Sequence, residues 1–191
     1  MTVRDQEEYI ALRATIRERG TARVCIFALG ITAWAAAAIA IAALASSPVA
    51  TLLPLLVLAA MFEGVFALHI GVERIGRYLQ VFHESTAAPT EPGPVGGRAT
   101  VDGWGWEHTA MAFGRPAGAA SADALFTAIF FLAALFNLMP ALILEPQRVE
   151  LIFVGGAHAL FALRLFVARH AAARQRAIDL ARFQQLKTGH T

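Results

Sequence analysis

The sequence predicts an all-α integral membrane protein with four transmembrane helices, organised as two hairpins. Its 191 residues are 57% hydrophobic and only 16% charged, whereas soluble domains carry about 25% charged residues. The mean hydropathy is +0.56, and the charges are segregated so that four long apolar runs remain. Each run is long enough to cross a bilayer, which takes roughly 20 predominantly apolar residues.

A stretch rich in proline and glycine, residues 86–120, separates two apolar parts of the chain. Residues 1–85 are expected to hold an N-terminal amphipathic helix and the first transmembrane hairpin. Residues 121–191 are expected to hold the second hairpin and a basic C-terminal helix. The linker is also expected to contain an interfacial segment, because Trp104 and Trp106 beside charged residues suit the headgroup layer.

The N-terminal helix is expected over residues 3–19, where Tyr9, Leu12 and Ile16 share one face at helical spacing. Gly20 follows this segment and is a natural C-terminal stop for a helix. We therefore expect a separate helix before the first span.

The four spans are expected at Val24–Ala45, Val49–Ile70, Ala124–Leu144 and Glu150–Val167. Short turns join the first span to the second and the third to the fourth. The second and fourth spans are followed by residues that still favour helix, so both helices should continue beyond the bilayer. We expect these helical extensions to reach about Phe82 and Phe183.

The basic residues predict the orientation of the spans. All of them except Arg148 lie before the first span, between the second and third, or from the end of the fourth onward. The positive-inside rule therefore places both termini and the linker in the cytoplasm. Lys187 is the only lysine, and this preference for arginine, together with abundant alanine, is typical of a GC-rich bacterial genome. We expect a multi-pass protein of the bacterial inner membrane.

Two stretches of the chain resemble each other. Phe62–Tyr78 and Ala157–His170 align with a constant offset that matches several apolar residues and pairs Arg74 with Arg169. The same alignment puts Glu63 opposite His158. The two hairpins would then be parallel repeats, although shared composition of apolar spans explains the likeness as well.

Three polar residues within the expected spans are candidates for a polar centre, since ionisable groups inside a span suggest a functional site by default. Glu63 is the one acid well inside a span, and His158 lies at matching depth in the fourth. We expect both to face the bundle interior and to lie near each other. Asn137 is an alternative donor, and we expect it to hydrogen-bond a neighbouring helix. The pair could conduct protons or bind a cation, or it could form a structural hydrogen bond that fixes helix pairing.

Arginines at the inner boundary suggest contacts with lipid headgroups. The candidate headgroup-binding residues are Arg74, Arg77, Arg164, Arg169, Trp104 and Trp106. The alternative is that the arginines only mark topology and extend their charges to the interface. A ligand or lipid site built from the Trp104–His108 loop is a further alternative.

Several classes of function have no support in the sequence. A single cysteine, Cys25, excludes an intrachain disulfide. His69 and Glu73 lie one turn apart on one face, as metal ligands can, but no His-x3-His or Glu-x2-His pattern accompanies them, so no metal is expected. Nucleophile elbows, phosphate-binding loops and dinucleotide-binding motifs are absent, and no cofactor is expected. The net charge of +2 is too small to indicate nucleic-acid binding.

We therefore expect a small non-enzymatic membrane protein that packs with itself or with a membrane protein partner in the lipid bilayer. Small-residue faces such as Gly30, Ala33, Ala37 and Ala40 would supply close helix contacts. Two alternatives remain open: proton or ion transport centred on Glu63 and His158, and a lipid-binding protein or membrane enzyme that uses the middle loop.

Overall fold

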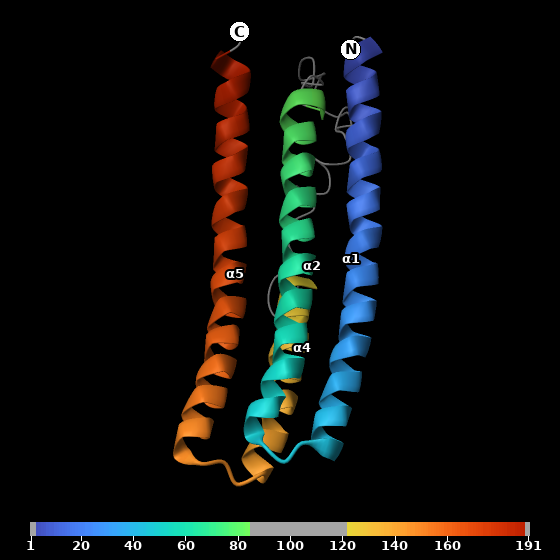
Figure 1. Cartoon of the computed structure of the whole chain (residues 1–191). Coiled ribbons are helices and arrows are strands. Elements are labelled where there is room, and N and C mark those ends of the chain that lie inside the picture. The colour runs from blue at the N-terminus through green and yellow to red at the C-terminus, as the bar shows by residue number, and fades with distance from the viewer. Residues whose placement is uncertain (1–2, 85–121, 190–191) are drawn as a thin grey trace, which may run out of the picture.

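The structure, a computed structural model, describes residues 3–84 and 122–189, and these parts of the chain are all-helical. Four helices are long and apolar enough to cross a membrane (Figure 1). They are α1 (Val3–Leu44), α2 (Leu52–Leu79), α4 (Ala122–Ile143) and α5 (Arg148–Gly189). The prediction of an all-helical protein with four membrane-length helices is confirmed. The three-part division of the chain stays a prediction.

Helix α1 is continuous through Gly20, so the expected break between an N-terminal helix and the first span is wrong. A glycine inside a helix costs only about 1 kcal/mol relative to alanine. Contacts with other helical segments hold both sides of Gly20 in one continuous element. The Tyr9 ring lies 5.8 Å from the His83 ring, and Phe27 packs against the buried core farther along the helix.

A short 3-10 turn, Pro48–Thr51, leads into α2, and Pro48 is tolerated there because a first-turn residue needs no helical donor. Helix α2 then runs without a break through Gly71 and Gly76. A π-helical segment, Gln80–Glu84, continues it. The prediction that the second and fourth helices extend well past their apolar parts is confirmed, since α5 also runs unbroken to its end.

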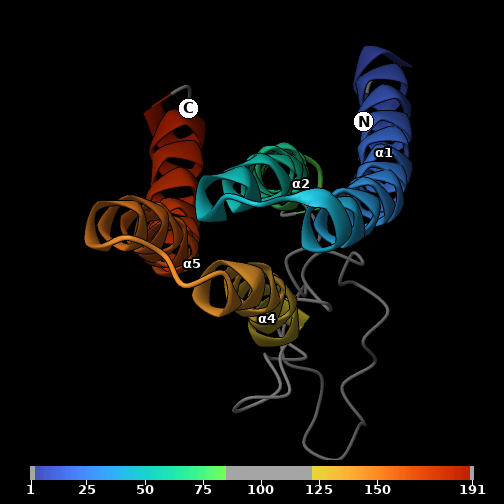
Figure 2. The same cartoon turned by 60° about the horizontal axis from the view of Figure 1, so that its bottom comes forward.

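Helix α2 lies between α1 and α5, and α4 packs against α5 and α2 (Figure 2). The first residues of α1 and the last residues of α5 lie at the same end of the molecule (Figure 1). Helix α4 is much shorter than α1 and α5, so three helices project beyond it at that end. The membrane-length parts thus form a four-helix arrangement, and the projecting parts are built from α1, α2 and α5.

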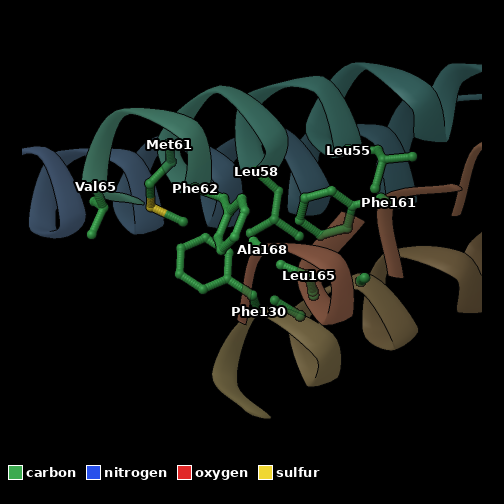
Figure 3. Close-up of a cluster of buried hydrophobic side chains, with 11 residues drawn as sticks. Leu55, Leu58, Met61, Phe62, Val65, Phe130, Phe161, Leu165 and Ala168 are labelled. Carbon is green, nitrogen blue, oxygen red and sulfur yellow. The ribbon is translucent and has the colours of Figure 1, made fainter. Parts of the chain in front are cut away.

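The buried core is centred on Phe62 of α2 (Figure 3). Its ring lies 5.2 Å from that of Phe130 in α4 and 6.2 Å from that of Phe161 in α5. Fully burying such a side chain contributes about 1.5–3 kcal/mol in water, and in lipid the same contacts act through close packing. None of the residues of α1 is buried, so this helix is held by partly buried contacts with α2.

Gly30 is a point of close approach between α1 and α2. A Cβ atom at Gly30 would lie 2.5 Å from both Cγ and Sδ of Met61, which is itself buried. The absence of a side chain therefore lets Met61 pack directly against the backbone of α1. The small-residue position that the sequence indicates is used here for packing within the chain.

Candidate functional site

A buried polar contact joins α4, α5 and the turn before α2. The Asn137 amide donates one hydrogen bond to the backbone carbonyl of Thr51, at 2.9 Å. The same amide nitrogen lies 3.1 Å from Nε2 of His158, and Nδ1 of His158 lies 2.8 Å from the carbonyl of Val154. Asn137 and His158 are 2% and 6% exposed. The expectation that Asn137 bonds a neighbouring helix is confirmed.

These partners fix the state of the His158 ring. A carbonyl can only accept, so Nδ1 must carry the proton that is donated to Val154. Nε2 is then the acceptor for the Asn137 amide, which has two donors and uses one on Thr51. The amide nitrogen of Asn137 and both ring nitrogens of His158 are satisfied with a neutral imidazole. A second proton on Nε2 would face the donors of Asn137, so the arrangement favours a structural role.

Glu63 does not lie near His158, and the expected contact between them is wrong. The Glu63 carboxylate binds Arg164 instead, with Oε1 2.7 Å from Nε and Oε2 2.8 Å from Nη2. The two side chains are 50% and 40% exposed, so Glu63 points away from the interior. Equal depth along their helices does not bring Glu63 and His158 into contact, because the rotation of each helix about its axis decides which side chains face each other.

The Arg164 guanidinium also lies over two aromatic rings. Its central carbon is 5.8 Å from the centre of the Phe62 ring and 5.4 Å from that of Phe66. Cation–π contacts of this kind favour a guanidinium held against the ring faces. The bidentate bond to Glu63 and the two rings together hold Arg164 in one orientation on the outer surface of α2 and α5.

A network of polar side chains, which we call the polar belt, crosses α1, α2 and α5 where the apolar run of α1 begins. Its members are Arg23, His69, Glu73, Arg74, Arg77, Arg176 and Asp179. Arg23 lies 3.2 Å from Nδ1 of His69, and Nε2 of His69 lies 3.5 Å from Glu73. Glu73 then holds Arg176 of α5 in a bidentate pair at 2.6 and 2.7 Å. The belt thus links three helices through charge-assisted bonds.

Asp179 is the centre of the other half of the belt. One carboxylate oxygen accepts from Arg77 at 3.1 Å and from Arg74 at 3.3 Å, and the other accepts from Gln175 at 2.7 Å. Burial by itself would raise the pKa of Asp179. The hydrogen bonds from Gln175, Arg74 and Arg77 outweigh burial and hold the pKa below its ordinary value. Asp179 is therefore a carboxylate at neutral pH.

A cavity of about 560 Å³ lies beside the belt. It is bounded by residues of α1, α2, α4 and α5, so it is walled by all four membrane-length helices. The lining residues are Arg23, Val24, Phe27, Phe62, Val65, Phe66, His69, Phe126, Thr127, Ile129, Leu165, Ala168, Arg169, Ala172 and Arg176. Its volume is in the range of about 300–1,000 Å³ that ligand sites occupy. One end is aromatic and apolar, and the other carries arginines.

The residues expected at lipid headgroups are distributed over three places. Arg74 and Arg77 bind Asp179, Arg164 binds Glu63, and Arg169 lines the cavity. Trp104, Trp106 and the rest of the Trp104–His108 loop lie outside the described residues. The polar belt also contains residues that the sequence did not single out as headgroup-binding.

Those added residues are Arg23, Glu73, Arg176 and Asp179. Arg19 lies close by, because the absence of a side chain at Gly71 lets its guanidinium lie against the α2 backbone. A hint was available, since Arg176 and Asp179 are spaced three apart and so share a helix face. Within the described residues, no group of three or more histidines, cysteines and acids could hold a metal ion. Comparisons with protein-family models, curated proteins and solved structures find no match for this chain.

Proposed function

We propose that this chain is a non-enzymatic assembly subunit of the bacterial inner membrane that packs with a second copy of itself or with a membrane protein partner. The observation that carries the proposal is the Glu63–Arg164 pair on the outer surface of α2 and α5. The two-hairpin arrangement, the orientation with both termini in the cytoplasm, and the parallel repeat belong to the same proposal. The basic-residue distribution supports this orientation.

The depth of the pair supports the proposal. Arg23 precedes the apolar run of α1 and contacts His69, so His69 marks the boundary of the apolar region on α2. Glu63 is six residues from His69, which corresponds to about 9 Å of helix rise into the apolar region. Charged side chains facing lipid are costly, at about 2.5–3.5 kcal/mol each at the bilayer centre. A protein surface over the half-exposed pair would remove much of that cost.

The pair is suited to contact with a second copy. An acid and a base side by side form a self-complementary patch. A two-fold axis along the membrane normal would bring Glu63 of one copy towards Arg164 of another, as isologous interfaces require. Apolar side chains surround the patch, with Leu56 66% and Leu160 68% exposed. Such a surface combines apolar packing with charge pairing that fixes orientation.

Crosslinking tests this interface directly. Ala67 is exposed one turn from Glu63, and the exposed native Cys25 lies on α1. In a Cys25→Ser background, Ala67→Cys should form a crosslinked dimer in native membranes. The chain that retains only Cys25 is the matched control and should crosslink far less. Glu63→Arg should abolish the Ala67→Cys dimer, and adding Arg164→Glu should restore it.

Two outcomes would overturn the proposal of self-association. One is equal crosslinking through Cys25 and position 67, which would indicate random collision. The other is a monomer in native mass spectrometry of the protein extracted with its lipids. Crosslinking of position 67 to one other membrane protein, lost in Glu63→Arg, would assign the same surface to a different subunit.

A proton or ion pathway has less support. It was expected to combine Glu63 with His158, but Glu63 binds Arg164 and His158 is satisfied by Asn137 and Val154. A lipid-binding or enzymatic role for the Trp104–His108 loop rests on residues outside the described ranges. The proposed function is therefore assembly.

A further inference from the structure

The cavity walled by α1, α2, α4 and α5 has a different character at its two ends. The part within the membrane-length helices is lined by aromatic and aliphatic side chains, among them Phe27, Phe66, Phe126 and Leu165. Phe27 of α1 lies 6.2 Å from the ring of Phe126 in α4, so aromatic residues from separate helices meet here. Apart from Thr127, the side chains of this wall are apolar, and an extended hydrocarbon chain suits it.

The other end of the cavity lies in the polar belt. Arg23, Arg169 and Arg176 line it together with His69. Arg176 forms a bidentate ion pair with Glu73. Neither Arg23 nor Arg169 forms an ion pair with any residue that the structure describes, and Arg23 donates to Nδ1 of His69. Two guanidinium groups without a carboxylate partner therefore stand at the mouth of an apolar cavity.

An anion with an attached hydrocarbon chain complements this arrangement. Guanidinium groups bind phosphate oxygens through paired N–H donors, and arginine suits such recognition better than lysine. Basic pockets between membrane helices are the places where anionic headgroups bind. A zwitterionic lipid would add a positive group to a mouth that already carries uncompensated positive charge.

We infer that this cavity binds one anionic phospholipid, with an acyl chain among the phenylalanines and its phosphate at Arg23 and Arg169. This inference does not depend on the proposed assembly function. The cavity lies on the side of α2 and α5 that meets α4, whereas Glu63 and Arg164 lie on the outer surface. Each idea can fail while the other stands.

Native mass spectrometry of the full chain, titrated with phosphatidylglycerol or with phosphatidylcholine of the same acyl chains, tests the inference. Phosphatidylglycerol should bind more tightly, with one molecule retained most strongly. Arg169→Gln should weaken that binding about five-fold, the effect of one basic residue near an anionic surface. Arg174→Gln is the matched control, because it removes an exposed arginine of α5 that does not line the cavity.

A second variant tests the acyl-chain part without a change in charge. Ala172 lines the cavity and is 7% exposed. Ala172→Leu should therefore fill the space that the acyl chain of the lipid occupies. It should weaken phosphatidylglycerol binding while the fold, followed by circular dichroism, stays intact. Glycerol phosphate, the headgroup without chains, should not compete with the lipid.

Three results would overturn the inference. They are equal affinity for the two lipids, equal loss from Arg169→Gln and Arg174→Gln, and full competition by glycerol phosphate. The last would indicate a site for a free phosphate compound. Loss of Ala67→Cys crosslinking with unchanged lipid binding would contradict the assembly proposal alone.

Discussion

The carboxylate of Asp179 lies 3.1 Å from Nη2 of Arg77, and the two side chains are 7% and 4% exposed. They come from α5 and α2 and are separated by 102 residues in the chain. Breaking a buried ion pair costs up to about 3–5 kcal/mol, and without Asp179 the buried Arg77 would keep only the longer contact to Glu73, at 3.5 Å. The contact therefore holds the projecting parts of α2 and α5 together.

Asp179→Ala should lower the free energy of unfolding by up to about 3–5 kcal/mol, the upper end being reached only if Glu73 does not compensate Arg77. Reversible denaturation in detergent micelles measures this change. Arg182→Ala is the control, since Arg182 is exposed on the same helix, and it should change stability by less than about 0.5 kcal/mol. Combining Asp179→Ala with Arg77→Leu should recover part of the loss. Equal stability of Asp179→Ala and wild type would show that the pair does not hold the helices.

Acid should weaken the protein through the same residue. The folded-state pKa of Asp179 is lowered, so its ionised form stabilises the fold. That stabilisation is present above the unfolded value of about 3.9 and is lost as pH falls through the folded-state pKa. Asp179→Asn should therefore lose less stability than wild type on acidification below about pH 4. Parallel curves for the two proteins would contradict this assignment.

Tyr78 should ionise at unusually high pH. Burial, the 2.7 Å hydrogen bond to Glu8 and the charges of Glu8 and Asp5 raise the pKa of Tyr78 to about 12. The chain has two tyrosines, so Tyr9→Phe leaves Tyr78 as the only one. An absorbance titration of that variant should give the raised value, and adding Glu8→Gln should lower it. An unchanged titration after Glu8→Gln would exclude the hydrogen bond as a cause.

The direction of the matching stability change follows from the raised pKa. The neutral phenol is favoured in the folded state, so its contribution is complete below about pH 10, the ordinary value for tyrosine. The contribution is lost as pH rises towards the folded-state pKa. Glu8→Gln should therefore reduce the loss of stability that Tyr78 causes in alkali.

Gly30→Ala should destabilise the contact between α1 and α2 by about 1–3 kcal/mol, because the new methyl group would overlap Met61. Gly156→Ala is the matched control in α5, where nothing lies within 4 Å of an added Cβ atom. It should be neutral or stabilising by up to about 1 kcal/mol. A double-mutant cycle with Met61→Ala should show coupling at Gly30 and none at Gly156. Equal effects of the two alanines would contradict the close packing at Gly30.

The proposed orientation predicts which residues are reachable from outside intact cells. In a Cys25→Ser background, cysteines at Ser47 and Gln147 should react with a membrane-impermeant maleimide. A cysteine at Thr188 should react only after the cells are opened, because the basic residues place that end in the cytoplasm. Labelling of Thr188→Cys in intact cells would reverse the topology.

The helices and their long extensions could be predicted from the sequence, because apolar length and helix propensity are properties of single segments. Gly20 misled the prediction, since a glycine stops a helix only where the flanking turns gain nothing by continuing. The turns that flank Gly20 do gain contacts when the helix continues, because Tyr9 lies against His83 and Phe27 packs against the buried core.

The partners of the polar side chains were harder to predict. Asn137 was correctly expected to bond a neighbouring helix, because an amide in an apolar span has few other options. Glu63 was paired with the wrong residue, and Asp179 was not singled out. Both depend on how α2 and α5 are rotated and staggered against each other, and that geometry comes from packing many apolar residues at once.

The difference in length between α4 and its neighbours has a mechanical consequence. In α1 the residues from Val3 to Arg23 precede the apolar run and correspond to about 30 Å of helix. The matching parts of α2 and α5 lie beside them. These two are joined by the ion pair of Asp179 with Arg77 and by the hydrogen bond from Lys187 to the carbonyl of Val81. The hydrogen bond from Tyr78 to Glu8 ties α1 to α2 as well, and three helices joined in this way resist bending far better than one. A soluble protein that contacts the tip would be kept at a fixed height above the bilayer, as a stiff spacer keeps two surfaces apart.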